Sequence, residues 1–591
     1  MCGIVGVFGK ENAPKYVLKG LRNLEYRGYD SWGIGAPCHG EVCIEKQIGK
    51  ISEAKLPEDF PKSTIAIGHT RWATHGGVTP ENAHPHCTED KKVAVVHNGI
   101  IENFSELRQE LILRGHLFAS DTDTEVLCHL LEEFLEEGED LVLACKKTAD
   151  RCEGRFAFVA VSSEDHRLVG VRNGSPLILG LGKNHEVYFA SDTPAFLEHT
   201  NHVWYIDDGE IVEASEKSLR VLSLDSLQEI QKRDVLLETS YEETHKGDHA
   251  HFMIKEIYEQ KNTIAQAINQ PEDEILKIAE EIRRARGTFL IGCGTAHKVA
   301  LAGEYFFSQI ARRHINTVVA SEFPIFHDFL QPESLVIAIS QSGETADVIE
   351  AIEAAREAGS EVVSIVNSEG STVDRMSDFT IHIKAGPEKA VASTKAATSQ
   401  LAVLLLLAYA TGRKFSAGKK ALIEAAAQVN DLLNPRFSEF LEKIAQSIAD
   451  KENIFIIGKG SNYPMALESA IKIQEVSYIH AEGFAAGELK HGPIAMIEKG
   501  TPCLVLVSDN DRQRREILSN AMEIKARGGN IIGIAPDNSE IFDHWIRVPR
   551  SGIASPILNL IPVQILSYYL AIARGFDPDK PRNLAKSVTV K

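Results

Sequence analysis

The sequence predicts a multidomain α/β protein, with layered sheets covered by helices in its first part and two doubly wound parallel-sheet domains after it. Three observations predict this fold class. The chain has 591 residues, which is too many for one hydrophobic core. Short β-prone runs fill the chain up to about residue 238, whereas long helical stretches alternate with wholly apolar runs from Phe252 onward. This second pattern also occurs twice.

The first part of the chain mixes strands with helices. Runs rich in valine, phenylalanine and alanine at 93–96, 156–161 and 187–190 are typical of buried strands. Residues 102–114 and 124–137 have the composition and spacing of helices. Clusters of strands separated by helices indicate sheets covered by helices.

The second part of the chain is predicted to contain two copies of one domain. Residues 288–296 match 454–462 at an offset of 166 (454 − 288), and two further strand-like segments match in the same order. Those pairs are 335–340 with 504–508 and 358–366 with 527–535. Alternation of helices with wholly apolar strands is typical of parallel βαβ units. We expect these limits along the chain: a first domain at 2–238, a linker at 239–251, domains at 252–430 and 431–580, and a tail at 581–591.

Composition narrows the class of protein. Hydrophobic residues make up 43% and charged residues 25% of the chain, as in globular enzymes. The net charge of −20 (63 basic minus 83 acidic residues) argues against nucleic acid or an anionic membrane as partner, but not against a small phosphorylated substrate. Nine scattered cysteines, no signal peptide and a short longest apolar run at 401–410 predict a cytoplasmic protein without disulfides.

Cys2 is the most informative single residue. If the initiator methionine is removed, Cys2 carries a thiol and a free α-amine, whose ordinary pKa values are about 8.5 and about 8. One residue then supplies both a nucleophile and its base, as in catalysts with an N-terminal nucleophile. The alternative is a small buried residue that opens a first strand.

Three polar segments offer partners for this thiol. Residues 69–76, His-Thr-Arg-Trp-Ala-Thr-His-Gly, combine a cation, an indole and two imidazoles. Asn98 and Gly99 follow an apolar strand, where an amide and a backbone N–H can form an oxyanion hole, although Asn-Gly also favours a turn. Residues 121–125, Asp-Thr-Asp-Thr-Glu, could clamp an amino acid together with Arg71, or could simply cap the helix that follows.

The histidines of this part do not predict a metal site. They lack the spacing of zinc ligands, so we expect no metal. The residues concerned are His69, His75, His84, His86 and His97.

An anion-binding pattern lies in the first of the two copies. Residues 340–345, Ser-Gln-Ser-Gly-Glu-Thr, follow a strand and open a helix expected at 346–358. Hydroxyls, a glycine and free N–H groups at a helix N-terminus can bind phosphate, although an ordinary serine-rich cap has the same composition. The segment lacks the Gly-Lys-Ser/Thr of a Walker loop, so ATP is not indicated. The matching residues 508–513, Ser-Asp-Asn-Asp-Arg-Gln, would repel phosphate, so only the first copy should hold it.

A charged helix face distinguishes the second copy. Glu468, Lys472 and Glu475 are spaced i, i+4 and i+7 in a helix expected at 463–478, so they share one face. As a solvated stripe they would contribute only about 0.2–0.5 kcal/mol per pair. A turn then presents His491, and Lys586 lies near the end of the tail.

Taken together, these motifs resemble one enzyme family. Segments 1–6, 24–31, 69–76, 97–103 and 121–125 resemble class II glutamine amidotransferases, specifically the isomerising glutamine–fructose-6-phosphate aminotransferases that make glucosamine 6-phosphate. The later motifs resemble the sugar isomerase (SIS) domains of that family, and the resemblance covers essentially the whole chain. It implies an αββα glutaminase fold of the N-terminal-nucleophile (Ntn) type, followed by two SIS domains and the tail.

The resemblance also implies roles for the residues of the first domain. Cys2 would attack the side-chain amide of glutamine, while Asn98 and Gly99 form the oxyanion hole. Arg71 would bind the glutamine carboxylate, Asp123 would bind its ammonium group, and the tryptophan at 72 would gate the ammonia route. The implied glutamine-binding residues are Arg71, Trp72, Thr74, His75, Gly76 and Asp123.

In the SIS domains, the resemblance implies ketose-to-aldose chemistry. His491 would open the sugar ring, Glu475 would move a proton between C1 and C2, and Lys586 would form a Schiff base. The implied sugar-phosphate-binding residues are Cys293, Gly294, Thr295, Ser340, Gln341, Ser342, Thr345, Val391, Ser393, Glu468, Lys472 and Ala585. In the family, this histidine is donated across a homodimer interface. The implied partners are glutamine, fructose 6-phosphate and a second copy of the chain, with no cofactor.

Two residues depart from the family pattern, and other functions remain open. Trp32 replaces a usually small residue and is expected to affect packing near the glutamine pocket. Ala296 replaces a usual serine, which removes a hydroxyl contact and leaves another phosphorylated keto sugar open as the acceptor. A SIS-type sugar-phosphate sensor would not need Cys2, Asn98, Glu475, His491 and Lys586. A glutaminase that feeds ammonia to another protein would not need the SIS domains.

Overall fold

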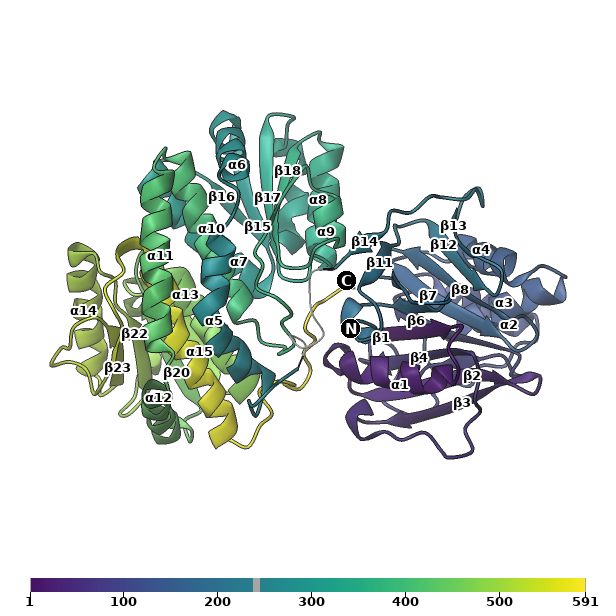
Figure 1. The fold of residues 1–591 in the computed structure, drawn as a ribbon. Coiled ribbons are helices and arrows are strands. Elements are labelled where there is room, and N and C mark those ends of the chain that lie inside the picture. Colours follow the sequence, from purple (N-terminus) through teal and green to yellow (C-terminus); the bar gives the residue numbers. More distant parts are fainter. Residues whose placement is uncertain (1, 238–244, 590–591) are drawn as a thin grey trace. The chain divides into compact units, whose positions relative to one another are not determined.

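The computed structural model describes residues 2–237 and 245–589. The chain divides into two compact units, one formed by 1–244 with 585–591 and the other by 245–584 (Figure 1). Part of the predicted linker, 239–244, lies outside the described residues.

Two antiparallel sheets form the first unit. Their strand orders are β14-β11-β9-β10-β1-β4-β2-β3 and β13-β12-β8-β7-β6-β5 (Figure 1). The strands of the first sheet are β1 (Gly3–Phe8), β2 (Ser31–Cys38), β3 (Glu41–Ile48), β4 (Ile65–Arg71), β9 (Ile178–Leu181), β10 (Val187–Ala190), β11 (His202–Tyr205) and β14 (Val235–Leu236). Those of the second sheet are β5 (His86–Cys87), β6 (Val93–Gly99), β7 (Phe156–Ser162), β8 (Arg167–Asn173), β12 (Glu210–Ser215) and β13 (Leu219–Ser223).

Alternating side chains build four layers from these sheets. In β1, Ile4 and Phe8 pack toward the second sheet in a shared core, whereas Val5 and Val7 pack against α1 (Ala13–Asn23) on the outer face. Three helices cover the outer face of the second sheet. They are α2 (Phe104–Leu113), α3 (Glu125–Glu136) and α4 (Leu141–Arg151). The layering is therefore αββα, as the family resemblance predicted.

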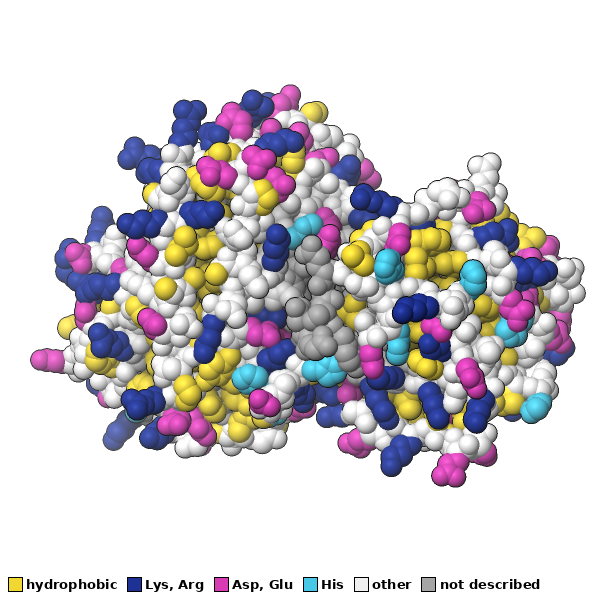
Figure 2. Space-filling view, in the orientation of Figure 1, with side chains coloured by type: hydrophobic (Ala, Val, Ile, Leu, Met, Phe, Trp, Pro, Cys, Tyr) yellow, Lys and Arg dark blue, Asp and Glu magenta, His cyan; other side chains and the backbone are white. Residues whose placement is uncertain are grey.

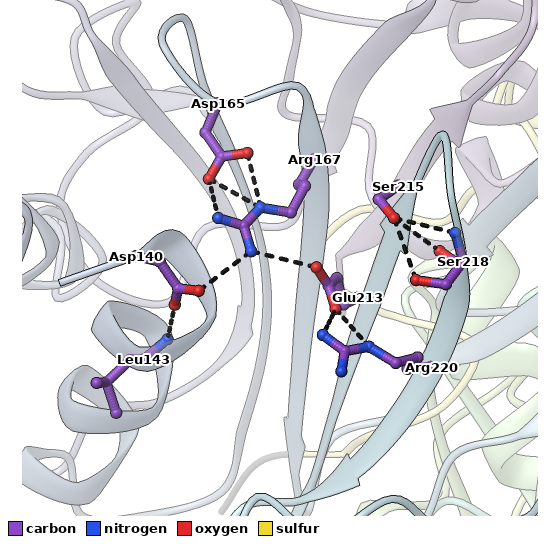
Figure 3. Close-up of polar contacts among 8 residues, drawn as sticks. All are labelled: Asp140, Leu143, Asp165, Arg167, Glu213, Ser215, Ser218 and Arg220. Carbon is purple, nitrogen blue, oxygen red and sulfur yellow. Dashed lines mark hydrogen bonds and ion pairs between the residues drawn. The ribbon is translucent and has the colours of Figure 1, made fainter.

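An ion-pair network ties α4 to the second sheet (Figure 3). Arg167 on β8 contacts Asp165 at 2.5 Å, Asp140 at 3.2 Å and Glu213 at 3.2 Å. Glu213 is only 5% exposed and also pairs with Arg220 across β12 and β13. Because one buried carboxylate serves two guanidinium groups, the network joins three strands and a helix without an unpaired buried charge.

Two five-stranded parallel sheets form the second unit. Their orders are β16-β15-β17-β18-β19 and β21-β20-β22-β23-β24, which is one topology used twice (Figure 1). The first sheet contains β15 (Gly287–Gly292), β16 (Asn316–Val319), β17 (Ser334–Ser340), β18 (Glu361–Val366) and β19 (Phe379–His382). The second contains β20 (Asn453–Gly458), β21 (His480–Ala485), β22 (Pro502–Leu506), β23 (Asn530–Ala535) and β24 (His544–Arg547). The predicted repeat is confirmed.

Helices cover both faces of each sheet in the second unit. Leu290 and Ile337 face one large core, while Phe289 and Val336 on the same strands face a second core under α8 (Ala346–Glu357). The helices are α5 (Phe252–Ile268), α6 (Glu272–Arg284), α7 (Gly294–Phe306), α8, α9 (Thr372–Arg375), α10 (Lys395–Thr411), α11 (Phe415–Leu432), α12 (Pro435–Ile448), α13 (Asn462–Ser477), α14 (Asp511–Lys525) and α15 (Ser555–Ala573). Burial on both faces explains why the strands are apolar throughout.

One apolar helix is longer than the apolar run noted in the sequence. By length and composition, the segment Gly552–Ala573 is apolar enough to cross a membrane. However, 83% of its apolar 18-residue stretch is buried inside the protein. Contacts with α12 and α13 account for this burial, which is typical of a core helix. On the face shown in Figure 2, acidic and basic side chains are interspersed over both units.

Candidate functional sites

Strand register places Cys2 beside the end of β4. β1 and β4 are antiparallel, and Gly3 lies opposite Thr70. The residue before β1 therefore meets the residues that follow β4. The backbone N–H of Trp72 donates to the Cys2 sulfur at 3.3 Å, and the thiol faces the Trp72 carbonyl oxygen at 3.5 Å. Burial raises the pKa of Cys2, while Arg71 acts to lower it.

The predicted oxyanion pair stands at the end of β6, not in a hairpin turn. The Asn98 side-chain amide donates to the Cys2 carbonyl oxygen at 3.1 Å, and its own oxygen lies 3.1 Å from Nε2 of His69. Gly99 has φ +113°, and a Cβ there would stand 2.1 Å from the Arg155 carbonyl oxygen. This close approach requires glycine and explains the Asn-Gly pair.

Burial favours the neutral form of the histidines around this pair. His69 stacks on His84 with ring centroids 4.0 Å apart, and burial lowers the pKa of His69 to about 3. Burial also lowers the pKa values of His84 and His97. A neutral His69 that donates to Asn98 fixes the amide with its NH₂ group toward Cys2. Sequence reasoning offered the 69–76 segment as a partner of the thiol but missed this positioning role of His69, because the contact with Asn98 joins two strands that are distant in sequence.

Arg71 and Asp123 shape the walls of the pocket. Arg71 is 3% exposed and donates to the carbonyl oxygens of His75, Gly76 and Gly77. Asp123 accepts from the Ile101 N–H at 2.9 Å. The predicted capping role of 121–125 is wrong in detail, because Thr124 at the N-cap makes no side-chain cap bond.

A single pocket gathers most of the predicted glutamine residues of the first unit. It is lined by Cys2, Arg71, Trp72, Thr74, His75, His84, His97, Asn98, Gly99, Thr122, Asp123, Thr124 and Thr589. Thr589 was not predicted, because its distance along the sequence gave no sign that the tail reaches this pocket. Gly76 does not line the pocket, but its carbonyl oxygen accepts a hydrogen bond from Arg71. Trp32 is 2% exposed in the core under α1 and does not line the pocket.

In the second unit, the predicted phosphate loop is a tight turn at the N-terminus of α8. The Gly343 N–H donates to Ser340 Oγ at 3.0 Å, and the Glu344 N–H donates to Ser342 Oγ at 3.2 Å. Gly343 has φ +65°, and a Cβ there would collide with Ser371 Oγ at 1.9 Å. Thr345 makes no side-chain cap bond, so the first N–H groups of α8 are not capped from within the helix.

The charged face of α13 is buried, which rules out the solvated stripe. Glu468 and Lys472 are 0% exposed, and Lys472 Nζ lies 2.5 Å from Glu475 and 3.6 Å from Glu468. Burial raises the pKa of Glu468 to about 7. Burial lowers the pKa of Lys472, but the two carboxylates outweigh it and the net shift is upward. The result is a buried lysine between two carboxylates, one of which is 23% exposed.

Contacts between the two SIS repeats complete this region. Thr295, at the start of α7, donates to Glu468 at 3.0 Å, which links the first repeat to the charged face of the second. Ser393 donates to Glu388 at 3.1 Å, and Glu388 also accepts from the Thr394 N–H at 2.9 Å. Sequence reasoning missed Glu388, although it stands only five residues before the predicted Ser393. The predicted residues Val391 and Ser393 lie in the turn that it holds.

The structure places the other predicted sugar-binding residues, but it does not bring all of them into contact with the charged face of α13. Cys293 and Gly294 lead into α7, whose second residue is Thr295. His491 is exposed at the end of the short helix Glu488–Lys490. Among the described residues, no hydrogen bond or ion pair joins its ring to the α13 face. Ala585 and Lys586 group with the first unit, so their approach to the sugar region stays a prediction.

The domain order seen in the structure agrees with comparisons with known proteins. The glutamine amidotransferase domain model matches residues 58–233, and the SIS domain model matches 281–410 and 447–574. Curated relatives named glutamine–fructose-6-phosphate aminotransferase [isomerizing] are 42% identical in Thermococcus kodakarensis and Pyrococcus horikoshii and 41% identical in Aquifex aeolicus, with 100% of both chains covered in each case. A solved C-terminal domain of the aminotransferase from Francisella tularensis is 32% identical with a TM-score of 0.52, and the match covers 57% of this chain and 100% of that one.

The fold and the cysteine pocket define the class of protein, a glutamine amidotransferase joined to two SIS domains. Within that class, the identity over full length decides the family. The chain belongs to the isomerising glutamine–fructose-6-phosphate aminotransferases.

Proposed function

We propose that this protein converts fructose 6-phosphate and glutamine into glucosamine 6-phosphate and glutamate. The observation that carries the proposal is the presence on one chain of two kinds of site. The Cys2 pocket suits amide hydrolysis, and the buried Glu468–Lys472–Glu475 group suits proton movement on a sugar. A protein with only one of these activities would not need the other site.

The glutaminase step uses the cysteine pocket. The Cys2 sulfur adds to the amide carbon of glutamine, and the oxyanion that forms accepts hydrogen bonds from Asn98 and the Gly99 N–H. The C–N bond then breaks, ammonia leaves, and water hydrolyses the thioester to give glutamate. Arg71 holds the α-carboxylate and Asp123 the α-ammonium group, with Trp72, Thr74 and His75 around the substrate.

The sugar step uses the SIS region. Ser340, Gln341, Ser342 and Thr345 bind the phosphate at the N-terminus of α8, where free N–H groups favour an anion. Lys586 forms a Schiff base with the ketose after His491 has opened the ring, and ammonia then displaces the lysine. Glu475 takes a proton from C1 and returns one to C2, which converts the ketose imine into the aldose amine.

Several further features belong to the same proposal. A homodimer would bring His491 of one subunit to the sugar site of the other, which agrees with the exposure of this histidine. The tail at 581–591 would close the sugar site and carry Ala585 into it. We also propose the domain limits given above, no cofactor, and a cytoplasmic location, which fits the family's metabolic role.

A product assay tests this function. The enzyme is given fructose 6-phosphate and glutamine labelled in the amide nitrogen, and the products are followed by mass spectrometry. Labelled glucosamine 6-phosphate is the expected result. Labelled ammonia with unchanged sugar would contradict the proposed acceptor, and no turnover of glutamine would contradict the glutaminase assignment.

One observation favours testing a second acceptor. Ala296 follows Thr295 at the start of α7, so this position lacks the hydroxyl that the family usually has. Another phosphorylated keto sugar should therefore be compared in the same assay. The Ala296→Ser variant is expected to lower KM for fructose 6-phosphate if the missing hydroxyl contacts that sugar.

A further inference from the structure

A cluster of histidines and glutamates lies apart from both sites, where the loop after α2 meets α3. His116 Nδ1 lies 3.4 Å from Glu132 Oε2, and His129 Nδ1 lies 3.3 Å from the same oxygen. One ligand atom from each of these three residues falls within 4.8 Å of the others. None of the three lines the cysteine pocket.

These distances suit a tetrahedral transition-metal site. Zinc binds imidazole nitrogen and carboxylate oxygen at about 2.0–2.2 Å, which places neighbouring ligands about 3.4 Å apart. Two of the ligand pairs here already have that separation. A carboxylate with two imidazoles favours zinc and similar ions over magnesium or calcium, which prefer oxygen ligands alone.

The outward nitrogens of both rings face further carboxylates. His116 Nε2 lies 3.2 Å from Glu133 Oε1, and His129 Nε2 lies 3.8 Å from Glu125 Oε1. The His116 contact is the one that metal-binding histidines usually make, because a carboxylate on the second ring nitrogen orients the ring and raises its basicity. The 3.8 Å separation at His129 is too long for a hydrogen bond. His129 is 2% exposed, and its Nε2 has no hydrogen-bond partner within normal distance. Both rings are thus already oriented with Nδ1 toward the same oxygen.

The outer carboxylates are themselves anchored. Arg114 contacts Glu133 at 2.7 Å. Glu125 accepts from the N–H groups of Ala119 at 2.7 Å and Ser120 at 2.8 Å. Glu125 therefore connects the cluster to the segment that leads into Asp123, one wall of the cysteine pocket.

We propose that His116, His129 and Glu132 form a binding site for a zinc-like divalent cation, with Glu133 and Glu125 as its outer shell. The side chains of His116 and Glu132 are 16% and 17% exposed, which leaves room for a water as fourth ligand. The ion ties the loop after α2 to α3 and takes no part in the transfer of ammonia.

The competing interpretation is an ion-pair network without metal. Burial lowers the pKa of His129, but Glu125 and Glu132 outweigh it and raise this pKa to about 9. A protonated ring would hold the glutamates together by itself. Bound metal must displace that proton, so the two interpretations differ in measured metal affinity.

Zinc binding by the full-length protein tests the proposal. The Cys2→Ala variant serves as background, because it removes one of the partly exposed thiols as a zinc ligand. Protein stripped with a chelator is titrated with zinc against a chromophoric chelator, and retained metal is counted by mass spectrometry after dialysis. We expect one zinc per chain, at least about 100-fold weaker binding in Glu132→Gln, and about 10- to 100-fold weaker binding in Glu133→Gln.

Two further variants keep the test decisive. His202→Gln removes an exposed histidine that pairs with Asp234 at 3.0 Å, and it should bind zinc like the background. If Glu132→Gln does not fold, the zinc affinity of His116→Gln tests the proposal in its place. Thermal unfolding measured in the presence of chelator shows whether each variant folds. No zinc retained by the background, or equal zinc in the background and in the folded ligand variants, would overturn the proposal.

Discussion

The two SIS repeats share one strand order but differ at two equivalent places, one at the start of a helix and one on the face of another helix. In the first repeat, the loop before α8 ends at Thr345, whose side chain makes no cap bond to the helix. In the second, Asn510 accepts from the N–H groups of Arg512 and Gln513 at the start of α14. Asp509 next to it accepts from the N–H groups of Ser551 and Gly552. The N-terminus is thus available to an anion in one repeat and occupied by the protein's own side chains in the other.

The second difference concerns the helix that follows the first strand of each repeat, which is α7 in the first repeat and α13 in the second. Subtracting the repeat offset of 166 from Glu468, Lys472 and Glu475 gives Ala302, Phe306 and Gln309. Ala302 and Phe306 are buried in the apolar core. The helix face that holds buried charged side chains in the second repeat therefore holds apolar core side chains in the first.

This comparison shows how one fold, used twice, can divide a task. The first repeat offers a helix end without a side-chain cap, where we propose that phosphate binds, and the second offers buried titratable groups. Thr295 connects the two, because it belongs to the first repeat and donates to Glu468 of the second. Four experiments test this division.

The largest effect is expected for Glu475→Gln in the second repeat. Loss of a general acid–base group typically costs about 10²- to 10⁴-fold in rate, so amino-sugar formation should fall by that factor while glutaminase activity is kept. The matched control is Gln309→Ala, an exposed change at the equivalent place in the first repeat, which should leave both rates unchanged. Equal losses in the two variants would show that the repeats do not divide the chemistry.

The next effect concerns the pH dependence of stability at Glu468. Its pKa is about 7 in the folded protein and 4.5 as the ordinary value, so between these values the folded chain binds more protons than the unfolded chain. The contribution of Glu468 to stability therefore falls as pH rises through this window, by up to about 3 kcal/mol. Glu468→Gln removes this loss, so its unfolding temperature relative to wild type should rise from about pH 5 to about pH 8.

A surface glutamate of the same repeat provides the control for that experiment. Hydrogen bonds from Lys459 and Arg512 lower the pKa of Glu516, so Glu516→Gln should show a flat difference from wild type over this range. Calorimetry at several pH values measures both variants. A flat or falling difference for Glu468→Gln would contradict the expected sign of the pH dependence.

A smaller effect is expected for Gly343→Ala in the phosphate loop. Its φ of +65° and the close approach of Ser371 make any Cβ distort the turn, so KM for fructose 6-phosphate should rise about 10- to 100-fold. Asp511→Ala is the matching change in the second repeat and should leave KM unchanged. Steady-state kinetics with saturating glutamine measures both, and a rise in both would place phosphate binding at both helix ends.

The smallest effect separates capping from binding. Asn510→Ala removes two cap bonds and should lower the free energy of unfolding by about 1 kcal/mol without changing KM. Thr345→Ala removes no cap bond, so it should cost less stability and yet raise KM for the sugar phosphate. Thermal unfolding and kinetics on both variants provide the comparison, and the reverse pattern would contradict it.

Much of the candidate chemistry was accessible from local sequence patterns. The structure brings together residues that these patterns singled out, namely Cys2 with the 69–76 segment, the Asn98-Gly99 pair, and Glu468, Lys472 and Glu475. The repeat at constant offset predicted two sheets of one topology, because apolar strands alternating with helices encode parallel βαβ units.

Other site features could not be predicted, because they depend on contacts between distant segments. Thr589 lines the pocket of Cys2, and Glu388 holds the turn of Ser393. Likewise, a glutamate next to a lysine looks the same in sequence whether the pair is solvated or buried. Only packing under α15 and α7 shows that the α13 face is buried, and that burial raises the pKa of Glu468.

By itself, the sequence determined which residue types were present, their spacing within each helix or strand, and the twofold repeat of the second part. These properties are local, since hydrophobic periodicity and helix-end chemistry depend on a few neighbouring residues. The tertiary structure alone decided which remote groups meet, such as His69 with Asn98, Thr295 with Glu468, and His116 with Glu132. Burial and protonation state follow from those contacts, because each depends on the atoms that surround a side chain in space.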